Sequence, residues 1–283
     1  MLAIPARELL HKIKTALTPY YDAREVEAIG LELLRHFAGL DRATISMNQT
    51  VAPGNQKTAL LDDAIERLKK QEPLQHVLGE TVFYDLVFKT DHRALVPRPE
   101  TEELVDWIIK DQKGRPIRLV DIGTGTGCIP IVLAKHLPQA KVTAIDVSSE
   151  ALKLAQENAQ LNSANIDFLQ LDILEEELPG VYDVIVSNPP YIPNSDKAQM
   201  ATNVLDFEPG LALFVPDEDP LRFYKRIAAL AGHQLTAGGC LFFEIHEAYG
   251  TELKWLLIEN GFKSVELRQD LQGKDRMIKA IKA

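Results

Sequence analysis

The chain has 283 residues, of which 46% are apolar and 25% are charged, a composition typical of a soluble globular protein. This composition excludes a disordered, collagen-like or coiled-coil chain, and the length accommodates one large domain with or without a small one. Asp and Glu outnumber Lys and Arg by 41 to 31, and the net charge of −10 argues against binding to nucleic acid through its phosphates. The only cysteines, Cys128 and Cys240, are too few for a disulfide framework and favour a reducing compartment.

The start of the chain and its apolar stretches indicate no targeting or membrane-spanning segment. The opening residues, M-L-A-I-P, lack the basic region and the long apolar run of a secretory signal. No stretch approaches the roughly 18 consecutive apolar residues that a membrane span requires. The sequence therefore predicts a cytoplasmic protein without membrane contact.

Residues 1–75 are expected to form a small helical domain. Apolar residues recur at helical spacing in three stretches, with polar residues between them. They are Leu9, Leu10, Ile13 and Leu17; Val26, Ile29, Leu33, Leu34 and Phe37; and Leu60, Leu61, Ala64, Ile65 and Leu68. Gly39 is the expected end of the second helix, because glycine readily adopts the left-handed conformation that ends many helices.

Residues 76–95 are the expected connector between this domain and the rest of the chain. Aromatic and β-branched side chains are concentrated at residues 81–84 and 86–88. Two such short runs side by side are typical of a β-hairpin. The larger domain is then expected to span residues 96–283.

Strands and helices alternate in the larger domain from about residue 115 onward. In chain order, the expected elements are a strand at residues 117–121, a helix ending near residue 136, a strand at 141–146, a helix at 149–162, and strands at 166–169 and 182–187. Residues 239–245 and the last twenty residues suggest two or three further strands. This alternation predicts an α/β fold, with a mostly parallel sheet and helices on both of its faces.

A glycine-rich loop lies between the first strand and the first helix of this alternating region. The run V-D-I-G-T-G-T-G places Gly123, Gly125 and Gly127 at alternate positions, with Thr124 and Thr126 between them. Glycines let the backbone turn tightly and let a ligand approach where a Cβ would otherwise lie. Because the following helix also presents free N–H groups at its start, the loop predicts a nucleotide-binding site.

Two acidic residues follow the next strands at the same edge of the predicted sheet. Asp146 ends the second strand and is placed to accept hydrogen bonds from ribose hydroxyls. Asp172 follows the third strand and is a candidate contact of an adenine amino group. NAD, FAD and S-adenosyl-L-methionine fit these features about equally, although the G-x-G-x-G spacing departs from the dinucleotide pattern G-x-G-x-x-G.

The tetrapeptide Asn188-Pro189-Pro190-Tyr191 follows the fourth strand and predicts the chemistry of the site. Neither proline can continue a central strand, so the chain turns rigidly and leaves carbonyl groups free. The side-chain oxygen of Asn188 and the carbonyl of Pro189 can accept the two N–H bonds of a planar amine, and Tyr191 can pack over its plane. This set predicts that an NH₂ group is aligned with a methyl donor in the glycine-loop site.

N-P-P-Y after the fourth strand resembles amino methyltransferases that act on adenine, on guanine or on protein glutamine. The rest of the chain is similar to one family among these, the HemK-type release factor glutamine methyltransferases. The matching segments are residues 73–79, 96–104 (V-P-R-P-E-T-E-E-L), 121–134, 144–152, 187–193, 208–213 (E-P-G-L-A-L), 238–245 and 270–276 (D-L-Q-G-K-D-R). The resemblance covers essentially the whole chain and implies a seven-stranded Rossmann-like methyltransferase domain after the helical domain and its β-hairpin.

The resemblance also implies a cofactor, S-adenosyl-L-methionine, which leaves as S-adenosyl-L-homocysteine. The glycine loop, Gly123 to Gly127, would hold its methionine part, Asp146 its ribose, and Asp172 and Ile173 its adenine region. Three residues would line the cofactor from the N-terminal side of the domain: Arg98, Glu100 and Thr101. No metal is implied, and the seven histidines show no metal-ligand spacing.

The family's substrate is the glutamine of the Gly-Gly-Gln motif in class 1 peptide chain release factors, whose side-chain amide nitrogen is methylated to modulate translation termination. Carried over, Asn188, Pro189, Pro190 and Tyr191 would hold the glutamine, with Asn188, Pro189 and Tyr191 in the catalytic roles and Asn188 also beside the cofactor. The helices of residues 1–75 would help to dock the release factor. We expect a monomer that does not bind nucleic acid directly.

Two other functions share parts of this pattern. A nucleic-acid amino methyltransferase would use the same glycine loop and N-P-P-Y turn, but it would need a flipped or single-stranded base. The net charge of −10 and the absence of a basic segment interleaved with aromatics argue against it. A binding module without activity would keep the fold but would not require N-P-P-Y.

Overall fold

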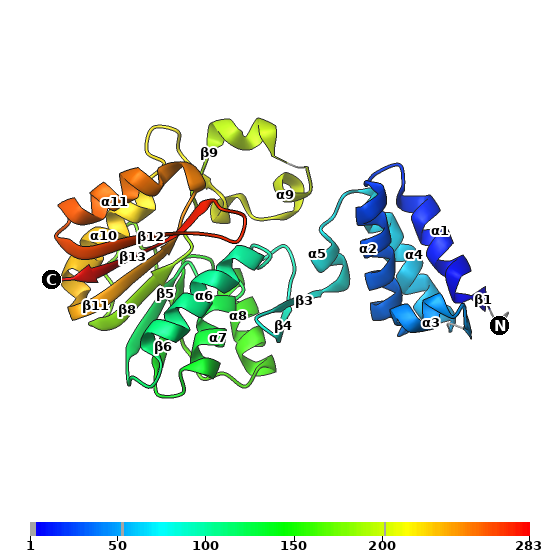
Figure 1. Ribbon diagram of the computed structural model, residues 1–283, viewed down its shortest axis with the longest axis horizontal. Helices are drawn as coiled ribbons and strands as arrows, with labels where there is room; N and C mark the ends of the chain where they lie inside the picture. The colour runs from blue at the N-terminus through cyan, green and yellow to red at the C-terminus, as the bar shows by residue number, and fades with distance from the viewer. Residues whose placement is uncertain (1–3, 52–53, 201) are drawn as a thin grey trace. The chain divides into compact units, whose positions relative to one another are not determined.

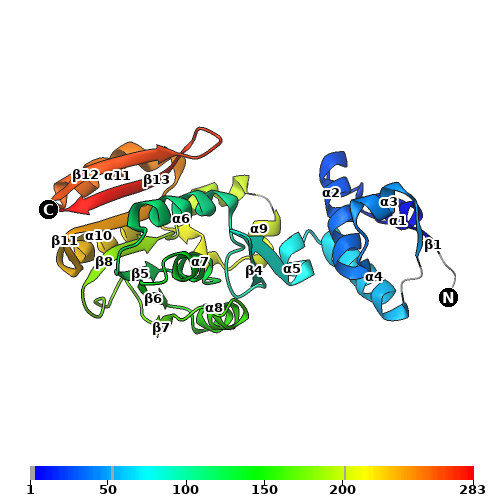
Figure 2. The ribbon, with the colours of Figure 1, turned by 60° about the horizontal axis from the view of Figure 1, so that its bottom comes forward.

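The computed structural model describes residues 4–51, 54–200 and 202–283, which divide into two compact units (Figures 1 and 2). The first unit comprises the described residues up to Gly79 together with the short helix α9 (Thr202–Phe207). The second comprises Glu80 to Met200 and Glu208 to Ala283. Across the described residues, no helix is long and apolar enough to cross a membrane.

The first unit is mainly helical. Besides α9, its elements are β1 (Ile4–Pro5), α1 (Ala6–Leu17), α2 (Ala23–Leu33), the π-helix η1 (Leu34–Ala38), α3 (Arg42–Ser46), β2 (Thr50–Val51), α4 (Asn55–Lys69) and α5 (Leu74–Leu78). The three predicted apolar stretches lie in α1, in α2 with η1, and in α4. Most of their side chains form one buried core, in which Ile13, Leu17 and Leu33 are fully buried.

Local capping residues set the ends of these helices. The Asp22 carboxylate accepts hydrogen bonds from the N–H groups of Arg24 and Glu25 at the start of α2. Gly39 ends η1 in the left-handed conformation, with φ of +70°, which confirms the predicted helix end. The short helix α3, capped by Asp41, was not predicted, because five residues carry too little periodicity to recognise.

The second unit begins with the predicted hairpin, β3 (Glu80–Phe83) and β4 (Leu86–Lys89). Asn158 ties β4 to the rest of this unit: its side-chain oxygen accepts from the N–H of Lys89 at 2.7 Å, and its NH₂ donates to the carbonyls of Lys89 and Thr126. The hairpin is therefore held against the glycine loop through one fully buried amide.

A seven-stranded sheet forms the centre of the second unit, in the order β12-β13-β11-β8-β5-β6-β7. The strands are β5 (Arg118–Ile122), β6 (Lys141–Asp146), β7 (Asp167–Gln170), β8 (Tyr182–Ser187), β11 (Leu235–Glu244), β12 (Phe262–Gln269) and β13 (Asp275–Lys282). The pairs among β5, β6, β7, β8 and β11 are parallel, whereas β13 pairs antiparallel with both β11 and β12. This confirms the expected seven-stranded α/β fold, and each predicted strand between residues 117 and 187 lies within one residue of its observed bounds.

Helices cover both faces of the sheet (Figures 1 and 2). One face carries α6 (Pro99–Gln112), α7 (Cys128–His136) and α8 (Ser149–Leu161), and the other carries α10 (Arg222–Gln234) and α11 (Gly250–Glu259). Alternate residues of each central strand enter the two cores: along β11, Cys240 and Phe242 face one core, and Leu241 and Phe243 the other. Burial on both faces explains why these strands are almost continuously apolar.

The segment between β8 and α10 carries several short elements. They are β9 (Ile192–Pro193), the 3₁₀ turn η2 (Asn194–Gln199), helix α9, the 3₁₀ turn η3 (Gly210–Ala212) and β10 (Phe214–Val215). β9 and β10 pair in parallel, so the chain returns to the N-P-P-Y turn after this excursion. A further 3₁₀ turn, η4 (Glu247–Tyr249), precedes α11.

Candidate active site

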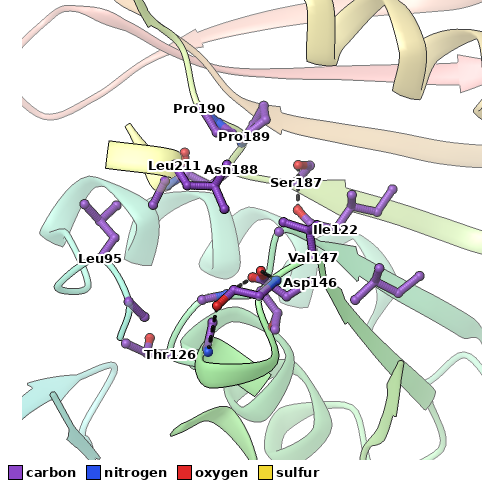
Figure 3. A pocket seen from close by; sticks show the side chains of 18 of the residues that line it. Leu95, Ile122, Thr126, Asp146, Val147, Ser187, Asn188, Pro189, Pro190 and Leu211 are labelled. Atoms are coloured by element: carbon purple, nitrogen blue, oxygen red, sulfur yellow. Dashed lines mark hydrogen bonds between the residues drawn. The ribbon is translucent and has the colours of Figure 1, made fainter. Parts of the chain in front are cut away.

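A cavity of about 210 Å³ opens at the carboxyl ends of the central parallel strands in the second unit. Residues at or just beyond the ends of β5, β6, β7 and β8 line it: Ile122, Asp146, Leu171 and Ser187. Figure 3 shows Ile122, Asp146, Ser187 and Asn188 around this space. Ligands of open α/β sheets bind at this edge, so the cavity is the candidate active site.

The glycine loop forms one wall of the cavity and depends on its three glycines. Gly123, Gly125 and Gly127 all have positive φ, at +75°, +55° and +79°. A Cβ on Gly127 would lie 3.1 Å from the Cβ of Ala155 and 3.1 Å from Cδ1 of Ile131, so this glycine also permits α7 and α8 to approach. Glycine is therefore required for conformation throughout the loop and for packing at Gly127.

Hydrogen bonds within the protein already use most of the N–H groups of this loop. Gly123 and Thr124 both donate to the Ile145 carbonyl at 2.9 Å, and Gly127 donates to the Thr124 carbonyl. Gly125 donates to Oδ2 of Asp146 at 2.9 Å. A dinucleotide site needs such amides for its pyrophosphate, so this loop favours a ligand without phosphate groups.

Asp146, the predicted ribose contact, lines the cavity at the end of β6. Its Oδ1 accepts from the N–H of Ser148, and its Oδ2 from that of Gly125. Burial raises the pKa of this carboxyl, while these hydrogen bonds act in the opposite direction. An ionised carboxylate accepts about four hydrogen bonds, so each oxygen keeps capacity for a ligand hydroxyl.

Asp121 is fully buried directly before the glycine loop, and sequence reasoning assigned it no role. Neither carboxylate oxygen has a hydrogen-bond partner of good geometry among the described residues, and the same holds for the hydroxyl of Thr124. Burial raises the pKa of Asp121 from 3.8 to about 7. A buried carboxylate without a counter-charge behind this wall suits a cationic ligand, and S-adenosyl-L-methionine carries both an ammonium and a sulfonium group.

The adenine end of the predicted site is mostly apolar. Asp172 and Ile173 both line the cavity after β7. The Asp172 carboxylate accepts from the N–H of Leu174 at 2.9 Å, which fixes the turn. Phe223 and Ile227, one helical turn apart on α10, complete this wall, and no pattern in the sequence singled them out for the site.

The N-P-P-Y turn borders the cavity close to the glycine loop. Asn188, Pro189 and Pro190 line the cavity and Tyr191 does not. The Tyr191 hydroxyl lies 3.4 Å from Oε1 of Glu244, and its ring packs against the core and against His246 at 5.8 Å between ring centroids. The backbone oxygen of Asn188 lies 4.0 Å from where a Cβ on Gly123 would be, so the N-P-P-Y turn passes directly beside the glycine loop.

Of the three residues predicted to line the cofactor from the N-terminal side, two border the cavity and one does not. Arg98 and Thr101 line the cavity and Glu100 does not. Glu100 Oε1 instead lies 3.5 Å from Nε2 of Gln272 in the turn between β12 and β13. Nη2 of Arg98 donates to both carboxylate oxygens of Glu208, at 2.8 and 2.9 Å, which joins the two chain segments that border the cavity.

The structure thus gathers most of the predicted site residues around one space. Those that line the cavity are Arg98, Thr101, Gly123, Thr124, Gly125, Thr126, Asp146, Asp172, Ile173, Asn188, Pro189 and Pro190, whereas Glu100, Gly127 and Tyr191 do not. Sequence reasoning missed Leu95 and Val96 and assigned no role to Leu211, although these lie in or beside the segments of family resemblance. Within the described ranges, no group of three or more His, Cys, Asp and Glu side chains could hold a metal ion.

Comparisons with known proteins decide the family. A model described as "PrmC N-terminal domain" matches residues 8–79, and one described as "Methyltransferase small domain" matches residues 101–206. A release factor glutamine methyltransferase from Flavobacterium psychrophilum is 44% identical over 269 residues, 93% of this chain and 94% of the relative. The chain belongs to the release factor glutamine methyltransferase family.

Other relatives agree with this membership. The release factor glutamine methyltransferase of Bacteroides thetaiotaomicron is 43% identical over 270 residues, 95% of this chain and 97% of the relative. A solved methyltransferase from Pyrococcus furiosus superposes with a TM-score of 0.52 at 19% identity, covering 81% of this chain and 98% of the other. The sequence relatives thus support the family, and the solved structure supports the methyltransferase fold.

Proposed function

We propose that this protein transfers a methyl group from S-adenosyl-L-methionine to the side-chain amide nitrogen of the glutamine in the Gly-Gly-Gln motif of class 1 peptide chain release factors. The observation that carries the proposal is that the Asn188-Pro189-Pro190 turn and the glycine loop line one cavity. The proposed site for a planar amine and the proposed site for a cationic nucleoside thus border the same space. The family membership identifies the amine as a release factor glutamine.

The cofactor is assigned to the wall that contains the glycine loop. We assign the methionine part to Gly123 and its neighbours up to Gly127, the ribose to Asp146, and the adenine to Asp172 and Ile173. Arg98 and Thr101, which line the cavity, are assigned to its rim, and Glu100, which does not line it, is left without a cofactor contact. When bound, S-adenosyl-L-methionine supplies an electrophilic methyl group on a sulfonium. When ionised, Asp121 supplies negative charge behind the loop, where most backbone amides are already hydrogen-bonded within the protein.

The amide nitrogen of a glutamine is a poor nucleophile, so the turn must hold it in line with the methyl group. The Asn188 side-chain oxygen and the Pro189 carbonyl accept its two N–H bonds, which fixes the plane of the amide. Two oriented acceptors also stabilise the positive charge that develops on nitrogen as the N–C bond forms and the S–C bond breaks. The methylated nitrogen then loses one proton, so the attack itself requires no general base.

The remaining parts of the proposal concern the partner and its docking. Residues 1–75 are proposed to dock the release factor, residues 76–95 to connect the domains, and residues 96–283 to carry the methyl transfer. The protein is proposed to act as a cytoplasmic monomer that modulates translation termination. A net charge of −10 supports a protein rather than a nucleic-acid substrate.

The test of the proposed function uses the full-length protein with S-adenosyl-L-methionine and a purified class 1 release factor. Mass spectrometry of the release factor after incubation should find one added methyl group, on the glutamine of the Gly-Gly-Gln peptide. S-adenosyl-L-methionine should bind to the protein alone, whereas NAD should not. A methyl group on another residue, or NAD binding in its place, would contradict the assignment.

A further inference from the structure

A chain of buried polar groups lies behind Asn188. Thr101, in the first turn of α6, donates its hydroxyl hydrogen to Oε2 of Glu244 at 2.6 Å. Nδ2 of Asn188 lies 3.5 Å from the same hydroxyl oxygen. Thr101 is 2% exposed and Glu244 1% exposed, so water does not compete for the hydrogen bond between them.

The direction of the hydrogen bonds in this chain determines how Asn188 is oriented. Burial raises the pKa of Glu244, while its hydrogen bond with Thr101 and the charge of Arg276 oppose this rise. In its ionised form this carboxylate only accepts, so the single hydrogen of the Thr101 hydroxyl goes to Glu244. The hydroxyl then faces Asn188 with its lone pairs, which attract the NH₂ group of the amide and repel its oxygen. Asn188 Oδ1, for which the described residues provide no hydrogen-bond partner, is left to face a ligand.

Glu244 also holds the other end of the N-P-P-Y turn. Its second oxygen, Oε1, lies 3.4 Å from the hydroxyl of Tyr191. Its backbone carbonyl accepts from the hydroxyl of the fully buried Tyr224 at 3.0 Å, which fixes the end of β11. One carboxylate at the end of β11 is therefore connected to both Asn188 and Tyr191.

We propose that Thr101 and Glu244 are positioning residues that orient the Asn188 amide with its oxygen toward the substrate. This inference rests on the proposed function and deepens it, because it assigns Thr101 to the substrate amide rather than to the cofactor. It also accounts for selection of glutamine over glutamate: a carboxylate would meet two acceptors, Asn188 Oδ1 and the Pro189 carbonyl, and have no hydrogen to offer either.

The first experiment removes the Thr101 hydroxyl at nearly constant volume. In Thr101→Val, we expect kcat toward the release factor to fall about 10- to 100-fold, because the side-chain amide of Asn188 can then rotate and exchange the positions of its oxygen and its NH₂ group. The affinity for S-adenosyl-L-methionine should change less than about 3-fold, since the loss of kcat arises from the changed orientation of Asn188 and not from a lost cofactor contact. Thr101→Ser keeps the hydroxyl and should restore most of the turnover.

A matched control lies at the opposite end of β11. Thr236 donates its hydroxyl to Oδ1 of Asp183 at 3.0 Å, so Thr236→Val also removes a threonine–carboxylate hydrogen bond from the same sheet. This variant should keep the kcat of the wild-type protein. A loss in Thr236→Val equal to that in Thr101→Val would show that general loosening of the sheet explains both, and would overturn the inference.

A double-mutant cycle tests whether Thr101 acts through Asn188. In an Asn188→Ala background, adding Thr101→Val should reduce the residual kcat less than about 2-fold, because the oriented amide is already absent. Discrimination between a release factor with Gly-Gly-Gln and one with Gly-Gly-Glu is measured as the ratio of their dissociation constants. This ratio should be smaller for Thr101→Val than for the wild-type protein.

Three further outcomes would overturn the inference. Thr101→Val that weakens cofactor binding with kcat unchanged would make Thr101 a cofactor contact. Losses that multiply in the double mutant would show that Thr101 acts independently of Asn188. Wild-type turnover in Thr101→Val would remove any role for the hydroxyl. A wild-type protein that methylates no release factor would instead contradict the proposed function, so the two failures are distinguishable.

Discussion

Arg98 meets Glu208 across the edge of the cavity, with one guanidinium nitrogen within 2.9 Å of both carboxylate oxygens. The pair is unequal in exposure: the Glu208 side chain is 1% exposed and that of Arg98 is 35% exposed. Burial raises the pKa of Glu208, whereas Arg98 lowers it. The carboxylate therefore depends on the guanidinium more than the guanidinium depends on the carboxylate.

This inequality predicts an asymmetric loss of stability. Arg98→Met should lower the free energy of unfolding by about 2–4 kcal/mol at pH 7, because it leaves a buried carboxylate without its partner. Glu208→Gln should cost less, and the double variant Arg98→Met/Glu208→Gln should recover part of the loss. Urea denaturation measures all three, with Lys153→Met, which breaks an exposed pair with Glu150, as a control expected within about 0.5 kcal/mol. Equal costs for the two single variants would contradict this account.

The two hydrogen bonds of Asp146 predict a cofactor-binding variant. Asp146→Asn replaces one acceptor oxygen by an NH₂ group, which then faces a backbone N–H of Gly125 or Ser148. We expect the affinity for S-adenosyl-L-methionine to fall about 10- to 100-fold, as for loss of a charge-assisted hydrogen bond. Calorimetric titration measures it. Asp183→Asn, at the opposite edge of the sheet, is the matched control, and a similar loss there would refute a local effect.

The packing at Gly127 predicts a difference between two glycines of similar backbone conformation. Gly114 has φ of +76°, and a Cβ added there would meet no atom within 4 Å, whereas a Cβ on Gly127 would lie 3.1 Å from two side-chain carbons. Gly114→Ala should lower the free energy of unfolding by about 1–2 kcal/mol, which reflects the strain of the left-handed conformation alone. Gly127→Ala should cost at least about 1 kcal/mol more, because α7 and α8 must move apart. Thermal or urea unfolding compares the two, and equal costs would argue against the contact.

The raised pKa of Asp121 predicts how stability depends on pH. The folded protein keeps a proton on this carboxyl up to about pH 7, whereas the unfolded chain loses it near 3.8. Between these values the folded state binds more protons, so the free energy of unfolding falls as pH rises and then levels off above about 7. In Asp121→Asn the decrease between pH 5 and pH 8 should be smaller. Urea titrations across this range measure it, and an unchanged slope would contradict the assignment.

The same carboxyl predicts the pH dependence of cofactor binding. Because Asp121 becomes ionised as pH rises through about 7, attraction for a cationic ligand should strengthen over the same range. The affinity for S-adenosyl-L-methionine should therefore increase from pH 6 to pH 8 in the wild-type protein and change less in Asp121→Asn. Calorimetry at several pH values would show this, and parallel profiles for the two proteins would rule out Asp121 as the cause.

Much of the fold could be predicted because the central strands have a recognisable pattern of residues in the sequence. β5, β6 and β8 are buried on both faces and therefore read as apolar runs between turn residues. Their carboxyl ends meet at one edge, so Asp146 and Asn188 could be expected in one site from strand order alone. The short elements between β8 and α10 lack such periodicity, and the antiparallel direction of β13 leaves no mark in its composition.

The hydrogen bonds and ion pairs between side chains of the site could not be predicted in the same way. Thr101 and Glu244 are 143 residues apart, and Arg98 and Glu208 are 110 apart. The first pair forms because the order of the strands brings α6 beside the end of β11. The second forms because the two chain segments that border the cavity meet there. Tyr191 was expected over the substrate plane, but its hydroxyl lies toward Glu244, a residue that only the folded structure places beneath it.

Competition between substrates for a labelled methyl group tests methyl transfer to the release factor glutamine most directly. Wild-type protein and labelled S-adenosyl-L-methionine are incubated with a class 1 release factor, the same factor with its Gly-Gly-Gln glutamine changed to alanine, and a nucleic-acid sample. Label is expected on the unchanged release factor alone, and the rate of labelling should fall about 10²–10³-fold in Asn188→Ala with cofactor affinity retained. Label on the nucleic acid, or equal label on the alanine form of the factor, would contradict this expectation.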